Sequence, residues 1–210
     1  AIKKDGSLWS WGSNVHGELG DGSTTNRNIP LRVGTENNWI RVWAHDSTSM
    51  GLKSDGTLWY WGKPSTIPLQ KGEDSDWVDI AGNVGLKSDG SIRFLDSPAQ
   101  HAVSDNDWVS ISFGTGFYIA KKADGTLWAW GDNTYGQLGI GSTINATIPT
   151  KIGQSSNWVA YSNYFYTYCM LAFQADGTLW EWGAMADGSN ALSPVQRSGI
   201  VVRHLYDLLV

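Results

Sequence analysis

One eight-residue stretch recurs along the chain and constrains the fold more than any other feature. It reads Asp124-Gly125-Thr126-Leu127-Trp128-Ala129-Trp130-Gly131, and it returns with few changes at 5–12, 55–62 and 176–183. A degenerate copy at 89–96 has lost the Trp-x-Trp pair. Self-similarity of this kind indicates a repeat architecture, in which one small unit of secondary structure is used several times.

Each copy predicts a tight turn followed by a strand. Asp-Gly between two apolar runs is a strong hairpin signal, because the turn needs a positive φ that glycine adopts without strain. In the strand that follows, Trp128 and Trp130 lie on one face, and Leu127 and Ala129 lie on the other. Because both faces are apolar, we expect the strand to be covered on both sides by neighbouring sheets.

A second element precedes each turn. A polar pair and a tryptophan open a β-branched or alternating run at Trp39, Trp77, Trp108 and Trp158. A small-residue turn and another apolar run then lead into the Asp-Gly turn. One unit therefore reads strand, turn, strand, Asp-Gly turn, Trp-rich strand and connection, and it has no helical periodicity.

The two ends of the chain complement one another in this pattern. Ala1-Ile2-Lys3-Lys4 resembles the end of an incoming strand, and Ile200–Val210 resembles a strand pair that lacks its Asp-Gly turn. Joined, they give one more unit, so the repeat closes on itself. We therefore predict an all-β fold with one domain over 1–210. It is a β-propeller of five blades of antiparallel strands, closed by pairing of the N- and C-terminal strands. The five repeat turns are at Asp5, Asp55, Asp89, Asp124 and Asp176.

Composition excludes several classes of function. The net charge is −5 and no basic run exceeds two residues, which argues against nucleic-acid binding. The single cysteine, Cys169, cannot form an intrachain disulfide, and no apolar stretch is long enough to span a membrane. Repetition accounts for twelve of the thirteen tryptophans, and Trp43 alone lies outside the scheme.

Two stretches resemble a known repeat. Leu52-Lys53-Ser54-Asp55-Gly56-Thr57-Leu58-Trp59-Tyr60-Trp61-Gly62 and Trp130-Gly131-Asp132-Asn133-Thr134-Tyr135-Gly136-Gln137-Leu138-Gly139 are similar to the repeat of the regulator-of-chromosome-condensation family, above all its bacterial, Trp-rich branch. The resemblance implies a propeller, usually of seven blades. It also implies one of three activities: nucleotide exchange on a small GTPase, inhibition of a bacterial hydrolase, or cell-surface adhesion. Exchange in the family depends on a protruding β-wedge, and no segment here is long enough for one.

Two long connections form the first candidate binding surface. We call 13–22 the first excursion and 132–141 the second excursion. One interpretation is that they cover the outer edge strand of a sheet, as in the family. The other is that they form two ridges that grip a partner. The candidate contact residues of the second interpretation are Asn14, His16, Asn133 and Tyr135.

The turns before the inner strands form a second candidate surface. If the register is right, they converge at one mouth of the central channel, where loops on a rigid scaffold commonly bind partners. Their aromatic and polar content suits a protein or sugar ligand, although turns in contact with water are also polar without any ligand. The candidates are His45, Asp46, Phe117, Tyr118, Tyr164, Phe165, Tyr166, His204, Tyr206 and Asp207.

Catalysis has little support in the sequence. The four histidines lie in different units without metal-ligand spacing, and no nucleophile or phosphate-binding motif is present. We therefore expect no catalytic residue, metal or cofactor. The sequence predicts a non-catalytic module that binds another protein at a secreted or cell-surface location. The alternative is a carbohydrate-binding propeller; a small-GTPase exchange factor and a structural unit of an assembly rank lower.

Overall fold

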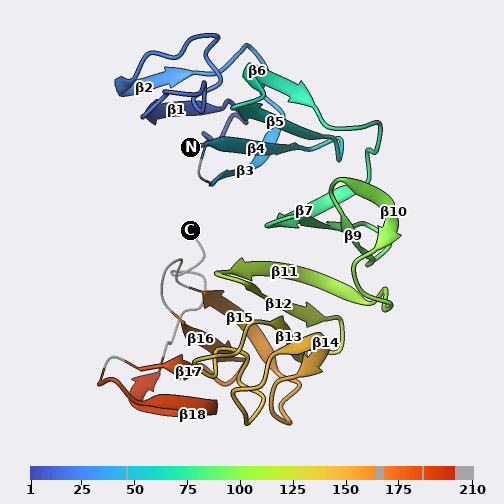
Figure 1. Ribbon diagram of the computed structural model, residues 1–210, viewed down its shortest axis with the longest axis vertical. Coiled ribbons are helices and arrows are strands. Elements are labelled where there is room, and N and C mark those ends of the chain that lie inside the picture. Colours follow the sequence, from blue (N-terminus) through green and yellow to red (C-terminus); the bar gives the residue numbers. More distant parts are fainter. Residues whose placement is uncertain (46, 164–167, 186, 202–210) are drawn as a thin grey trace. The chain divides into compact units, whose positions relative to one another are not determined.

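The computed structural model describes residues 1–45, 47–163, 168–185 and 187–201, and in these residues all regular structure is β-strand. The chain divides into two compact units, Ala1–Asp79 and Ile80–Val210, and each is described by itself. All paired strands are antiparallel, and they form five sheets (Figure 1). The all-β prediction and the number of sheets are confirmed, and the single-domain assignment stays a prediction.

The first unit contains one small and one full sheet. Strands β1 (Trp9–Gly12) and β2 (Arg27–Arg32) form a two-stranded sheet. The full sheet has the order β3-β4-β5-β6, so each strand pairs with its neighbours in sequence. Its strands are β3 (Trp39–His45), β4 (Thr48–Lys53), β5 (Leu58–Gly62) and β6 (Ser65–Gln70).

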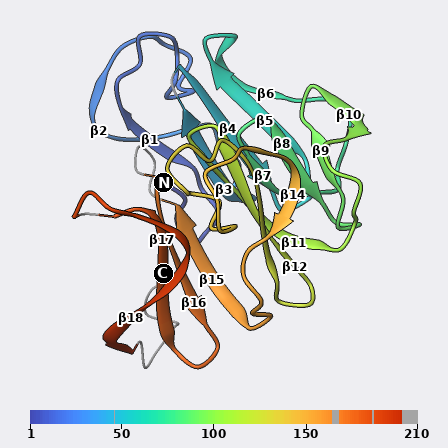
Figure 2. The same cartoon turned by 60° about the horizontal axis from the view of Figure 1, so that its bottom comes forward.

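Three more sheets follow the same plan, in which the strand after each Asp-Gly turn is the third of four (Figure 2). The first comprises β7 (Trp77–Ala81), β8 (Val84–Lys87), β9 (Ile92–Phe94) and β10 (Ser97–His101). The second comprises β11 (Trp108–Gly114), β12 (Phe117–Lys122), β13 (Leu127–Gly131) and β14 (Ala146–Lys151). The third comprises β15 (Trp158–Asn163), β16 (Cys169–Gln174), β17 (Thr178–Ala184) and β18 (Asn190–Val201). The prediction that Trp39, Trp77, Trp108 and Trp158 open strands is confirmed.

A hydrogen-bonded relay explains why the turn carries Asp, Thr and Trp at fixed spacing. The Asp55 carboxylate accepts hydrogen bonds from the backbone N–H and the hydroxyl of Thr57, at 3.0 and 2.7 Å. The Thr57 hydroxyl in turn accepts the indole N–H of Trp59 at 2.9 Å. The hydrogen bonds from Thr57 hold the pKa of Asp55 below its ordinary value. The relay therefore fixes the first tryptophan of each strand to the preceding turn.

The degenerate copy keeps this relay with a different donor. Ser91 donates its backbone N–H to Asp89 at 2.9 Å, as in the intact copies. The guanidinium of Arg93 then donates to the Ser91 hydroxyl at 3.0 Å, where an indole stands elsewhere. The Asp-Gly turn is thus present in this sheet although its strand lacks Trp-x-Trp.

The glycine of the turn has a steric role. Gly56 has a φ of 79°, and an added Cβ would lie 2.1 Å from the backbone oxygen of Ser75. Its carbonyl accepts the N–H of Trp77 at 3.2 Å, so the turn also anchors the strand that opens the next sheet. A side chain at this position would clash with backbone that is held in place by that hydrogen bond.

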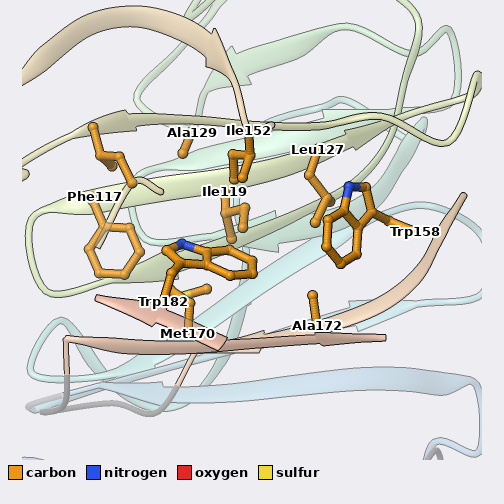
Figure 3. Packing of buried hydrophobic residues seen from close by; sticks show 10 residues of the cluster. Phe117, Ile119, Leu127, Ala129, Ile152, Trp158, Met170, Ala172 and Trp182 are labelled. Atoms are coloured by element: carbon orange, nitrogen blue, oxygen red, sulfur yellow. The ribbon is translucent and has the colours of Figure 1, made fainter. Parts of the chain in front are cut away.

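Strand β13 is covered on both faces, as predicted from its alternation. Leu127 and Ala129 pack in a buried cluster with Met170 and Trp182 of the sheet that follows (Figure 3). Trp130, on the opposite face, belongs to a second cluster with Leu86 and Trp108. One strand therefore contributes to two cores, which is why its sequence is apolar at successive positions.

The C-terminal prediction needs one correction. We expected Ile200 to begin a separate strand pair. Instead, Ile200 and Val201 are the last residues of β18, and Val201 lies opposite Thr178 of β17. Beyond an irregularity in register, the chain after Ser198 pairs with β17 again at Val201, so these residues extend the outer strand. Residues 202–210 lie outside the described residues.

Candidate functional site

The first excursion is folded around one buried asparagine. The side-chain amide of Asn14 donates to the carbonyls of Ser23 and Thr25, at 3.0 and 3.1 Å. Its side-chain oxygen accepts the N–H of Leu19 at 2.9 Å. Asn14 is fully buried. Its polar atoms therefore hold the loop together and are not presented to a partner.

The second excursion repeats this arrangement. Asn133 is fully buried, and its amide donates to the carbonyls of Ser142 and Ile144, at 2.8 and 3.0 Å. Its side-chain oxygen accepts the N–H of Leu138 at 3.0 Å. Two of the four candidates on the excursions are thus structural supports of those loops.

Both excursions cover the edge of a sheet, which confirms the first interpretation of these loops. Gly22 of the first excursion donates its N–H to the carbonyl of Thr66 in the outer strand β6, at 2.9 Å. The carbonyl of Glu18 accepts the indole N–H of Trp61 at 2.8 Å. The second excursion makes the equivalent contacts: Gly141 donates to Leu192 in β18 at 2.7 Å, and the Gln137 carbonyl accepts from Trp182 at 3.0 Å.

The tips of the excursions remain at the surface. The side chain of His16 is 46% exposed, and its Nδ1 lies 3.2 Å from a carboxylate oxygen of Glu18. Tyr135 occupies the equivalent place in the second excursion and is 41% exposed. Its ring stacks on Tyr168 with 4.4 Å between centroids and 26° between planes. These two candidates are therefore accessible, and Tyr135 is held in a fixed orientation.

The structure separates the two candidates of the β11–β12 turn. Phe117 is fully buried and packs in the core with Ile119 and Trp182 (Figure 3). Tyr118 is partly buried, stacks on Trp130 at 5.4 Å and donates its hydroxyl to the side chain of Asn83. Burial raises the pKa of Tyr118. Of this pair, Tyr118 alone has a ring that borders the surface.

The side chains of the remaining candidates lie outside the part of the chain that the structure describes. His45 is the last residue of β3, and its side chain lies outside the described part. The others fall on residues outside the described ranges: Asp46, Tyr164, Phe165, Tyr166, His204, Tyr206 and Asp207.

Sequence reasoning missed a groove in the first unit. It has a volume of about 430 Å³, and its aromatic lining includes Trp9, Trp11 and Trp43. Trp11 is 50% exposed, and the carboxylate-bearing residue Glu18 lies at the same groove. Trp43 was the available signal, because it is the tryptophan that the repeat does not require.

None of the described His, Cys, Asp and Glu side chains form a group of three that could hold a metal ion. Burial raises the pKa of the Cys169 thiol, which makes the nucleophilic thiolate scarcer. No helix long and apolar enough to cross a membrane occurs in the part of the chain that the structure describes.

Comparison with known proteins agrees with the repeat analysis. Residues 5–52 and 124–162 match the family model of the regulator of chromosome condensation (RCC1) repeat, and residues 108–137 match a second model of that repeat. Human E3 ubiquitin-protein ligase HERC2 is 27% identical over 190 residues, which are 88% of this chain and 4% of HERC2. The ultraviolet-B receptor UVR8 of Arabidopsis thaliana is 28% identical over 153 residues, which are 72% of this chain and 31% of UVR8.

The chain is thus much shorter than these relatives. Among solved structures, Prp20p from Saccharomyces cerevisiae has a TM-score of 0.75 at 17% identity, over 95% of this chain and 63% of Prp20p. At this level of identity the likeness concerns the fold, and it identifies the antiparallel sheets as blades of the propeller type. Over residues 5–52 and 108–162, the chain thus contains repeats of the regulator of chromosome condensation (RCC1) type.

Proposed function

We propose that this chain is a non-catalytic module that binds another protein. The observation that carries the proposal is the stacked pair of Tyr135 and Tyr168, in which Tyr135 is 41% exposed and yet held in place. A rigid exposed tyrosine offers a large contact area at a low cost in side-chain entropy. The similar Prp20p binds Gsp1p and histones, which supports protein binding as the general activity.

A binding experiment with matched variants tests this proposal. Tyr135→Ala should weaken capture of a protein partner about tenfold or more, because aromatic residues dominate binding energy at interfaces. Thr134→Ala changes the preceding exposed residue of the same excursion and is the control. On the first excursion, His16→Ala is the corresponding test variant, and Val15→Ala is its control. Equal binding by Tyr135→Ala and the parent would remove the second excursion from the proposed surface. A glycan array tests the carbohydrate alternative, since bound glycan with no captured protein would favour it.

We also propose that the five sheets close into a ring, with the C-terminal segment beside β1. The support is that β1 pairs with β2 alone among the described strands, whereas β5, β9, β13 and β17 each pair on both sides. The N–H of Trp9 donates to the carbonyl of Ala1 on the side away from β2, at 2.8 Å. By the two-residue period of a strand, the backbone of Trp11 faces that same open side.

Hydrogen exchange tests ring closure directly. If the C-terminal segment pairs with β1, the amide of Trp11 should be protected, and removal of residues 202–210 should abolish its protection. The amide of Leu31, which faces β1, serves as the internal reference. Fast exchange at Trp11 in the complete chain would argue against closure.

The proposed location is secreted or at a bacterial cell surface, on the basis of the sequence resemblance alone. Cell fractionation of the source with an antibody to the chain would test it. Recovery in the cytoplasmic fraction alone would overturn this part of the proposal.

A further inference from the structure

The outer strands share a proline at one register position. Each of the outer strands β2, β6, β14 and β18 has an irregularity in its register with the neighbouring strand. The last residue paired before it is Leu31 in β2, Leu69 in β6, Thr150 in β14 and Val195 in β18. The residue just before it is in each case a proline: Pro30, Pro68, Pro149 and Pro194. Each of these strands is the edge of its sheet. The repetition of proline at one place in four edges calls for a physical reason.

The direction of the missing donor follows from the strand period. The N–H of Val33 donates to the Leu8 carbonyl, so Val33 faces inward to the sheet. Leu31 then also faces inward and Pro30 faces outward, because successive backbone groups alternate. The bonds from Lys71 to Leu58 and from Ile152 to Leu127 place Pro68 and Pro149 outward by the same count. The absent N–H is therefore lost from the free edge and not from the sheet.

Two of these edges have a second protection. The carbonyl of Thr66, two residues before Pro68 and on the same edge, accepts the N–H of Gly22 from the first excursion. The carbonyl of Leu192, two residues before Pro194, accepts the N–H of Gly141 from the second excursion. Within the described residues, β2 and β14 have no such excursion bond at their edges.

The uncovered edges also expose the more apolar surface. Ile29 is 69% exposed and Ile148 is 71% exposed, each directly before its proline, whereas Ile67 on the covered strand β6 is 51% exposed. An exposed β-branched edge with free backbone groups is a template for pairing with another strand. In β2 and β14, the template is interrupted by the proline and by the irregularity in register beside it.

We propose that Pro30 and Pro149 prevent the edges of β2 and β14 from pairing with the same edges of a second copy of this chain. An incoming strand would meet a missing donor and a ring at the centre of the edge. This inference is independent of the proposed function, because it concerns the outer strands and not the excursion tips.

Matched substitutions test the proposal. Pro30→Thr and Pro149→Thr restore an edge N–H with a residue that favours strands, and each should strengthen self-association about tenfold, as one or two new hydrogen bonds would. Pro68→Thr and Pro194→Thr make the same chemical change at edges that an excursion covers, and they should leave association at the level of the parent. Sedimentation over a range of concentrations gives the measurement, and circular dichroism confirms that each variant is folded.

A second change distinguishes edge pairing from general loss of structure. Adding Ile29→Lys to Pro30→Thr should return association to the parent level, because a charge on the strand opposes pairing. If a variant is misfolded, hydrogen exchange of the Gly22 and Leu31 amides will show it. Unchanged association of Pro30→Thr and Pro149→Thr, or equal association of all four proline variants, would overturn the proposal.

Discussion

Trp11 and Trp61 hold the same position in the repeat and have opposite environments. Trp61 is 2% exposed, packs edge-on to Trp39 and donates its indole N–H to the Glu18 carbonyl. Trp11 is 50% exposed at the groove of the first unit. Since the local sequences are nearly identical, the difference lies in what surrounds each strand.

A third member of the set identifies the cause. Trp130 is 8% exposed although no long excursion precedes its sheet; it packs on Trp108 and Tyr118 from the first two strands of its own sheet. Trp11 lies in a sheet whose described part contains two strands only. Burial at this position therefore depends mainly on the first two strands of the same sheet, and an excursion adds a hydrogen bond on top.

The largest loss of stability is expected when Trp61 is truncated, and Trp11 gives the matched comparison. Trp61→Ala should cost about 3–5 kcal/mol of unfolding free energy, because it leaves a cavity in a packed core. Trp11→Ala should cost about 1 kcal/mol or less, because Trp11 is 50% exposed. Urea unfolding of the two variants and the parent measures both. Equal losses would mean that the C-terminal segment buries Trp11, which would support ring closure.

Removal of the asparagine that holds an excursion should come next in size. Asn133→Ala removes the partner of the buried Leu138 N–H and of the Ser142 and Ile144 carbonyls, which should cost about 2–3 kcal/mol. Thr134→Ala, at an exposed neighbour, should cost almost nothing. Thermal unfolding measures the loss, and faster hydrogen exchange of the Gly141 amide, which donates to Leu192, would show that the excursion has left its sheet. Unchanged exchange together with full stability would contradict the role given to Asn133.

Two glycine substitutions measure how tightly the first excursion packs on Trp61. An added Cβ at Gly20 would lie 2.9 Å from the Trp61 ring, whereas nothing lies within 4 Å of one at Gly34. Both residues have a positive φ, of 72° and 63°. Gly34→Ala should therefore cost about 1 kcal/mol for backbone strain, and Gly20→Ala about 1–2 kcal/mol more for the contact. Chemical denaturation measures both losses of unfolding free energy. Similar losses for the two variants would show that the excursion can shift to accommodate the added methyl group.

The smallest effect on stability should come from the turn carboxylates Asp5 and Asp55, and it should be similar for both. Hydrogen bonds from Ser7 and Thr57 lower the folded-state pKa of Asp5 and Asp55. Each carboxylate therefore stabilises the fold above its unfolded pKa, near 3.8, and this contribution is lost as pH falls through the folded pKa. Asp5→Asn and Asp55→Asn should flatten the acid limb of stability against pH to a similar small degree. A clear difference between the two variants would tie the turns to the unequal burial of Trp11 and Trp61.

The sequence predicted most of the strands because their pattern has a local cause. Asp-Gly turns and the alternation over 127–130 are set by backbone preference and by burial on two faces. The roles of Asn14 and Asn133 were mistaken for surface chemistry, since a polar side chain in a loop gives no sign of whether its partners are its own backbone. The exposure of Trp11 could not be predicted from the sequence either, because it depends on strands that are distant in sequence. Pairing of Val201 with β17 depends on an irregular register that no short pattern encodes.

The relay at Arg93 has a consequence for how such chains are found and compared. The Arg93 guanidinium and the Trp59 indole each donate an N–H to the hydroxyl two residues earlier, so the turn keeps its hydrogen bonds with either side chain. The family models match residues 5–52 and 108–162, so the turn at 89–96 lies outside them, as do the intact copies at 55–62 and 176–183. A search for the Trp-x-Trp pair would miss 89–96, whereas a search for a carboxylate, a hydroxyl two residues later and any N–H donor two residues beyond would recover it together with the intact copies.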